Sequence, residues 1–422
     1  MKNIKFKLIL MNFLEFAVWG AYLTSQGRYL ASVGLGGQIG WFYSIQGIVS
    51  IFMPALIGIL ADKWLPAQKM LGICHFICGL SILAAGYYGM TVGDSVQFSV
   101  IFSLYTISVA FYMPTLALAN SVAYTILERS GEDIVKAFPP VRVFGTIGFI
   151  VSMWAVDLLG FQASAMQYVV SGGLGLVLGA YAFTMPDCSV ENKSSVEKPS
   201  LLESMGLKAF SLFKERKMAV FFIFSFLLGS ALQISNGFAN TFIGDFGAIS
   251  DYADTFGVKH SNMLISLSQI SETLCILLIP FFLRKLGIKK VMLTAMLAWV
   301  LRFGFFAIGN PGTGVWLFVL SMIVYGVAFD FFNISGSLFV DENTNPEIRS
   351  SAQGLFMLMT NGLGAGIGSL VAQAVVTAKT GAFEGAEKMA GWSQAWLIFA
   401  AYALILAILF AICFRYKHIQ KA

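Results

Sequence analysis

The chain has 422 residues, of which 57% are hydrophobic and only 12% are charged, and its mean hydropathy is +0.77. Soluble globular domains carry about 25% charged residues, so this composition excludes them and indicates a membrane protein. Apolar runs close to the length of about 20 residues that a helix needs to cross the hydrocarbon core recur along the whole chain. We therefore predict an all-α polytopic membrane protein with twelve transmembrane helices.

The net charge of +5 is best interpreted by its position along the chain. If the N-terminus is cytoplasmic, the loops on that side receive most of the Lys and Arg residues, and the outer loops receive only Lys259, Lys379 and Lys388. Cytoplasmic loops are enriched in basic residues, so we expect both termini to face the cytoplasm. The first apolar run lacks a cleavage site of small residues and is expected to be retained as a span. No nucleic-acid partner is needed to explain the charge.

The predicted helices fall into two sets of six. The first set is expected at about 8–30, 38–61, 70–90, 96–124, 140–159 and 165–185, and the second at about 218–242, 262–283, 291–308, 315–340, 351–378 and 392–414. Residues 186–217 form the longest polar stretch, which we interpret as a cytoplasmic linker between an N-terminal bundle, 1–185, and a C-terminal bundle, 218–422. The glycine-rich run Gly362–Ser369 is expected to permit close helix packing.

The cysteines do not form a pattern typical of disulfides or metal sites. Their number is odd, and most lie in apolar runs, so we expect small hydrophobic side chains. Cys74, His75 and Cys78 lack a fourth metal ligand, and packing is the preferred interpretation. The five cysteines are Cys74, Cys78, Cys188, Cys275 and Cys413.

The tenth predicted helix has a carboxylate, Asp330, near the middle of an otherwise apolar segment. An Asp at the centre of a span costs about 2.5–3.5 kcal/mol on insertion scales, so such residues usually face a bundle interior or a water-filled path. Tyr325 and Phe329 form an aromatic flank beside it, four residues apart. The alternative is a purely structural carboxylate that a neighbouring helix satisfies. One face of this helix carries Gly326, Asp330, Asn333 and Ser337.

Four other predicted helices also carry polar residues on one face at mid-membrane depth, and the first of them contains Glu15. We expect these faces to line one central cavity. Amides, carboxylates and aromatic rings suit a small neutral polyhydroxylated or heterocyclic solute better than a lipid or an ion. Hydrogen bonding between helices explains any single Gln or Asn equally well, so the interpretation depends on their convergence. The other faces contain Arg142, Gly145, Thr146 and Phe149; Gly229, Gln233, Asn236 and Asn240; and Ser268, Gln269 and Glu272.

The segment GILADKW, Gly58–Trp64, resembles the loop motif of the major facilitator superfamily, Gly-x-Leu-Ala-Asp-Arg/Lys, and lies between the second and third predicted helices. The resemblance implies the major facilitator fold, with two six-helix bundles. It also implies that Gly58, Asp62 and Lys63 belong to a conformational loop motif, in which charges hold helix ends together in one conformation. The alternative is a helix end with charges that are there by chance.

A second resemblance covers nearly the whole chain. The segments FPPVRVFGTIGFI from residue 138, SLSQISETL from residue 266 and SMIVYGVAFDFFNISGS from residue 321 resemble the bacterial nucleoside:proton symporter family of that superfamily. This resemblance implicates Asp330 in proton coupling, and we expect Glu272 to share that role. Gln is usual in the family at the position of Glu15, whose role stays open. The substrate-binding residues it implies are Arg142, Thr146, Phe149, Gln233, Asn236, Gln269, Glu272, Tyr325, Phe329 and Asp330.

The family resemblance implies a proton-coupled nucleoside importer that works by alternating access in the bacterial inner membrane. Its coupling ion is H+, it has no other cofactor, and a monomer is expected. A sugar:proton symporter of the same superfamily is the alternative function. An enzyme is disfavoured because the chain contains neither an HExxH pair nor a GxSxG elbow.

Overall fold

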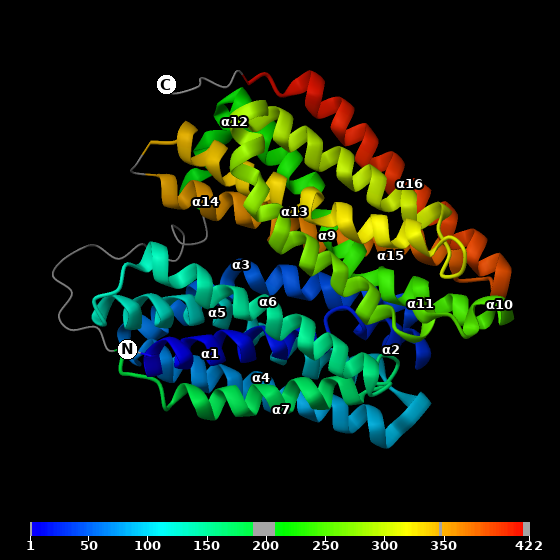
Figure 1. Ribbon diagram of the computed structural model, residues 1–422, viewed down its shortest axis with the longest axis horizontal. Helices are drawn as coiled ribbons and strands as arrows, with labels where there is room; N and C mark the ends of the chain where they lie inside the picture. Colours follow the sequence, from blue (N-terminus) through cyan, green and yellow to red (C-terminus); the bar gives the residue numbers. More distant parts are fainter. Residues whose placement is uncertain (1, 189–206, 346–347, 417–422) are drawn as a thin grey trace. The chain divides into compact units, whose positions relative to one another are not determined.

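The computed structural model describes residues 2–188, 207–345 and 348–416, and every regular element in these ranges is a helix (Figure 1). The predicted all-α class is confirmed. By their contacts the residues form two compact units, the first comprising Met1–Gln38 and Ile48–Leu201 and the second Ile39–Gly47 and Leu202–Ala422. The predicted linker at 186–217 lies largely outside the described residues, and the predicted domain boundaries stay a prediction.

Unit 1 is built on close contacts of α1 with α6 and of α4 with α5 and α7. Glycines permit the first contact: a Cβ on Gly148 of α6 would lie 2.0 Å from the carbonyl oxygen of Phe13, and one on Gly20 of α1 would lie 2.4 Å from that of Phe149. Small residues let helix backbones approach in this way in membrane proteins. The helices are α1 (Lys2–Gly20), α2 (Gln26–Ser32), the part of α3 (Ile39–Lys63) that begins at Ile48, α4 (Ala67–Val92), α5 (Phe98–Arg129), α6 (Ile134–Leu158) and α7 (Met166–Ala182).

Unit 2 is centred on the contact between α12 and α13, the most extensive between any two of the described helices. At Gly326 of α13 a Cβ would lie 2.6 Å from the carbonyl of Ser271 on α12, so only glycine lets the two helices come this close. The helices are α9 (Arg216–Asp245), α10 (Ser250–Ala253), α11 (Phe256–Lys259), α12 (Ser261–Ile308), α13 (Val315–Asn343), α14 (Arg349–Met357), a π-helix (Leu358–Gly364), α15 (Ala365–Thr380) and α16 (Gly385–Cys413).

Two predicted helix boundaries are wrong. The first predicted helix, 8–30, is not continuous, because α1 ends at Gly20 and a turn precedes α2. The fifth begins at Ile134 rather than at residue 140, and Pro139 and Pro140 lie inside it. Proline loses an N–H hydrogen bond in a helix, but its fixed φ is compatible with the helical backbone, so two prolines near the start of a helix do not mark where it begins.

The predicted helix at 351–378 is also wrong in its middle, since seven residues, Leu358–Gly364, form a π-helix between α14 and α15. The glycine-rich run there packs against α9 as expected: a Cβ on Gly364 would lie 2.5 Å from the carbonyl oxygen of Phe226, and one on Gly368 would lie 2.1 Å from the Cβ of Ser230. The prediction of close packing at Gly362–Ser369 is confirmed.

Nine helices of the described chain are long and apolar enough to cross a membrane. One of them, α12, has 48 residues and contains the eighth and ninth predicted spans, which meet at Gly287 with φ 74°. Glycine adopts this backbone conformation without steric cost. The apolar helix α7 is shorter, with 17 residues. The count of twelve spans therefore stays a prediction.

Candidate functional site

In unit 2 the contact between α12 and α13 places two carboxylates near each other. Gly326, which touches the backbone of Ser271 and Glu272, lies one helical turn before Asp330 and on the same face of α13. Asp330 is 5% exposed, Glu272 is half-buried, and the two carboxylates interact electrostatically. A proton taken up by either one removes their mutual repulsion.

Three oxygens of the predicted site residues are buried and have no hydrogen-bond partner among the described residues: Oδ2 of Asp330, Oε1 of Gln269 and Oε1 of Gln233. They belong to α13, α12 and α9, three helices of the same unit. Buried polar atoms are nearly always paired, and an unpaired one costs about 1–3 kcal/mol. All three atoms are acceptors, so they suit a ligand that brings hydroxyl or N–H donors.

The aromatic flank predicted on α13 is a stacked pair. The rings of Tyr325 and Phe329 have centroids 5.9 Å apart and an interplanar angle of 8°. The Cζ of Arg302 lies 4.5 Å from the centroid of the Tyr325 ring, and Trp299 meets the same ring edge-on at 6.0 Å. Tyr325 is therefore held from two sides, and its orientation sets that of the stack.

Arg302 is a residue that the sequence interpretation missed. It is 2% exposed, and its Nε donates to Oγ of Ser235 at 2.8 Å while its Nη1 donates to the carbonyl oxygen of Ser321 at 2.7 Å and to Oγ of Ser268 at 3.3 Å. These hydrogen bonds connect α9, α13 and the two parts of α12 that lie before and after Gly287. An Arg in the interior of a predicted span is as unusual as Asp330, so the same rule would have identified it.

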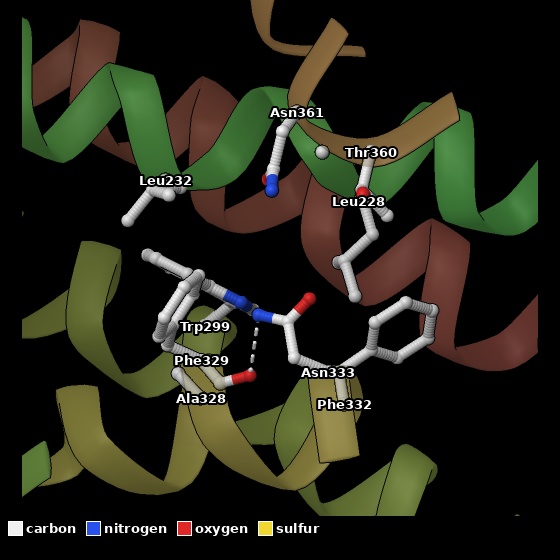
Figure 2. A pocket seen from close by; sticks show the side chains of 10 residues that line it. Leu228, Leu232, Trp299, Ala328, Phe329, Phe332, Asn333, Thr360 and Asn361 are labelled. Atoms are coloured by element: carbon white, nitrogen blue, oxygen red, sulfur yellow. Dashed lines mark hydrogen bonds between the residues drawn. The ribbon is translucent and has the colours of Figure 1, made fainter. Parts of the chain in front are cut away.

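A small hollow lies in unit 2 between α9, α12, α13 and the π-helix, and its cavity volume is about 20 Å³. Figure 2 shows the side chains of Asn333 and Asn361 on opposite sides of it, with Trp299 and Phe329 beside them. Of the predicted site residues, Phe329 lines this hollow. Asn333 was placed on the polar face of its helix from the sequence, whereas Trp299 and Asn361 were missed.

The predicted site residues of unit 1 lie on α6, against α1. The Cζ of Arg142 lies 4.0 Å from the centroid of the Phe16 ring. Phe149, which is 7% exposed, meets Trp19 edge-on, with centroids 6.2 Å apart. Unit 1 thus carries a cation and an aromatic group within two turns of α6. That they line one cavity with the residues of unit 2 stays a prediction.

Other predicted polar residues are satisfied by the protein itself. Glu15 is fully buried, and its Oε2 lies 2.8 Å from Nε2 of His75 on α4, while Oγ1 of Thr115 on α5 donates to its Oε1 at 2.6 Å. The expectation that Glu15 faces the cavity is therefore wrong, because both carboxylate oxygens bind neighbouring helices. Nδ2 of Asn240 on α9 donates to Oδ1 of Asn262 on α12 at 2.7 Å. This residue therefore makes a hydrogen bond between helices, which was the alternative interpretation to lining the cavity.

Neither the cysteines nor the loop motif adds a chemical site. The five cysteines are free thiols, and His75 beside Cys74 and Cys78 is occupied by Glu15. Gly58 lies in α3, close to its end. The side chains of Asp62 and Lys63 lie outside the described part of the structure, so the predicted charge clamp stays a prediction.

Comparison with known proteins gives consistent matches over the whole chain. The family model of the nucleoside H+ symporter matches residues 1–419. The chain is 46% identical to the xanthosine permease of Escherichia coli over 99% of its length and 97% of the relative, and 45% identical to the nucleoside permease NupG of the same organism with the same coverage. A solved structure of NupG covers 98% of this chain and 100% of its own, at 44% identity and a TM-score of 0.88.

Proposed function

The chain belongs to the nucleoside H+ symporter family, and on that premise we propose that it imports nucleosides together with protons by alternating access between two bundles. The family is one of transporters, which leaves no role for an enzymatic step. We further propose that it resides in the bacterial inner membrane as a monomer, with both termini in the cytoplasm. The positions of the basic residues support this orientation.

One observation carries the proposal: Gln233, Gln269 and Asp330 present buried acceptor oxygens without partners in the described chain. A ribose offers several hydroxyl donors, and a site that leaves its acceptors unpaired when empty favours a solute that pairs them. Glu272 and Asn236, on the same helices as the two glutamines, add polar groups to this set. The stack of Tyr325 and Phe329 supplies flat apolar surface for a base.

In unit 1 we assign Arg142, Thr146 and Phe149 to the same substrate. A solute held by both bundles favours their closure around it, which is the step that alternating access requires. Asp330 and Glu272 are assigned to proton coupling because they interact across the contact of α12 and α13. One proton moving through 100 mV supplies about 2.3 kcal/mol, enough for roughly a fifty-fold solute gradient.

The proposed function is tested by uptake of labelled uridine into proteoliposomes that contain the purified protein. We expect accumulation only with an inward proton gradient, and competition by adenosine but not by a disaccharide. Uridine uptake that does not depend on the proton gradient would contradict symport. Competition by the disaccharide alone would favour the sugar transporter instead.

Glu272→Gln is expected to reduce the preference of the protein for nucleosides over free bases. A site built to bond a hydroxyl rejects a ligand without it because its own polar groups are left unpaired. We expect wild-type protein to bind uridine at least about tenfold more tightly than uracil, and the variant to lose much of that ratio. Equilibrium binding of both ligands to each protein gives the ratio. Equal affinity of the wild type for uracil and uridine would contradict a role of Glu272 in binding the ribose hydroxyls.

Phe329→Leu is expected to weaken the binding of purine and pyrimidine nucleosides alike, by several-fold, without changing the proton dependence of uptake. Leu keeps apolar volume but removes the ring, and ring stacking is worth about 0.5–1.5 kcal/mol beyond area burial. Binding and thermal melting are measured on the same preparation. If Phe329 serves packing alone, the melting temperature falls and the affinity of the folded protein does not change.

A further inference from the structure

The two parts of α12 meet in a basic turn, residues 284–290, where the backbone departs from the helix at Gly287. Four of these seven residues are Lys or Arg. The sequence contains no Asp or Glu between Glu272 and Asp330, so α12 offers no acid after Glu272 to balance them. The basic turn therefore concentrates positive charge without an acidic neighbour in the sequence. The cations are Arg284, Lys285, Lys289 and Lys290.

Packing gives the three lysines of the basic turn no carboxylate partner among the described residues. Nζ of Lys289 donates to the carbonyl oxygen of Ala411 on α16 at 2.9 Å. Nζ of Lys285 lies 5.8 Å from the centroid of the Phe281 ring, one helical turn earlier on α12. Lys285 and Lys290 are both exposed. Their charges are therefore available to an anion that is not part of the described chain.

Basic residues elsewhere on the side that we assign to the cytoplasm do have acidic partners. Nζ of Lys5 lies 2.8 Å from Oε1 of Glu132, and Nζ of Lys136 lies 3.4 Å from Oδ2 of Asp133. Both pairs are at least partly exposed, and such surface pairs are ordinary features of a solvated protein. The lack of acidic partners therefore distinguishes the lysines of the basic turn from these two.

An exposed apolar stripe runs along α12 up to the basic turn. Its five side chains are 39–74% exposed and follow one another at steps of three or four residues, so they lie on one face of the helix. Large apolar side chains that are exposed on a membrane span contact acyl chains. Arg284 and Lys285 continue the same spacing, so the stripe ends in cations. The stripe consists of Ile270, Leu274, Leu277, Leu278 and Phe281.

We propose that the basic turn binds the headgroup of an anionic phospholipid, whose acyl chains lie along the apolar stripe. Lysine ammonium groups donate to phosphate oxygens, and basic residues at the cytoplasmic end of a span are suited to anionic headgroups. A zwitterionic lipid carries the same phosphate together with a cation, which the lysines repel. Free phosphate has no chains to cover the stripe. The proposal goes beyond the proposed function, because it uses none of the residues assigned to nucleoside or proton.

The test compares dioleoylphosphatidylglycerol, which is anionic, with dioleoylphosphatidylcholine, which has the same acyl chains and no net charge. Each lipid is titrated into the purified full-length protein in neutral detergent, and native mass spectrometry counts the lipids bound. For the first lipid that binds, we expect the wild type to prefer the anionic one at least about fivefold. In the double variant Lys285→Gln with Lys290→Gln, the two lipids should bind within about twofold of each other.

Two further variants separate the basic turn from net charge. Lys5→Gln with Lys136→Gln removes the same charge from the same assigned side of the membrane, but from cations that have acidic partners, and it should keep the wild-type preference. Lys285→Arg with Lys290→Arg keeps the charge of the basic turn and should keep the preference too. Thermal melting shows that each preparation is folded. If the double Gln variant does not fold, Lys290→Gln alone is expected to lower the preference at least about twofold.

Three results would overturn the lipid assignment. The first is equal affinity of the wild type for the two lipids. The second is an equal loss of preference in the Lys5 and Lys136 variant, because the effect would then follow the net charge of the protein. The third is displacement of the bound lipid by millimolar inorganic phosphate, which would indicate a site for a free anion. Each of them leaves nucleoside transport to its own test.

Discussion

Asp330→Asn is expected to abolish the accumulation of uridine against its gradient in proteoliposomes, while nucleoside binding remains measurable. Asn has the same size and still offers an oxygen acceptor, but it cannot take up a proton. Asp330 is buried, one of its oxygens has no partner among the described residues, and it interacts with Glu272. The substitution therefore removes the carboxylate whose protonation would link proton binding to solute binding.

The control is Asp341→Asn, a carboxylate near the end of the same helix that pairs with Arg349 at 3.2 Å and is half-exposed. It should accumulate uridine as the wild type does. Uptake is measured with and without an imposed proton gradient, together with equilibrium binding. If the Asn variant at position 330 still concentrates uridine, Asp330 is not the coupling residue.

Arg302→Leu is expected to cause the largest loss of stability among the substitutions considered, about 2–5 kcal/mol of unfolding free energy. The guanidinium donates to Ser235, Ser268 and the carbonyl of Ser321, and its loss leaves their buried oxygens without this donor. Each unpaired buried acceptor costs about 1–3 kcal/mol. The cation above the Tyr325 ring is lost as well.

Thermal melting in detergent checks this result, and Arg302→Lys should fall between the wild type and the Leu variant, because Lys keeps the charge but not the planar fork. Arg284→Leu, at an exposed position of α12, is the control and should melt close to the wild type. Because Arg302 also orients Tyr325, the folded fraction of the Arg302→Leu variant should bind uridine more weakly than the wild type does. An unchanged melting temperature would mean that the hydrogen bonds of Arg302 make no net contribution to the stability of the protein.

Much of the helical framework was predictable because it depends on local properties. An apolar run of spanning length forms a helix in lipid because each backbone N–H and C=O must then be satisfied within the segment. The predicted segment 315–340 accordingly lies within α13, Val315–Asn343. The predictions failed at Gly20, where the helix stops inside an apolar run, and at Pro139, where it continues through a proline.

Periodicity did not predict the π-helix, whose close contact with α9 joins residues that are far apart in the sequence. Only the structure shows that Gly229 lies against the carbonyl of Thr360, 131 positions along the chain and on another helix. The same holds for Asn361, which follows Thr360 in the chain and lines the hollow. Its amide has no local feature that distinguishes it from the amides that bond between helices.

The sequence by itself determined that the chain is a helical membrane protein and that Asp330 lies at the depth where a charge is costly, since both follow from composition and segment length. The tertiary structure decided which polar residues are paired and which are not. Glu15 is satisfied by His75 and Thr115, whereas Asp330 and Gln269 keep unpaired oxygens in the described chain. The reason is that a pairing needs two helix faces to meet, and those faces belong to residues far apart in the sequence.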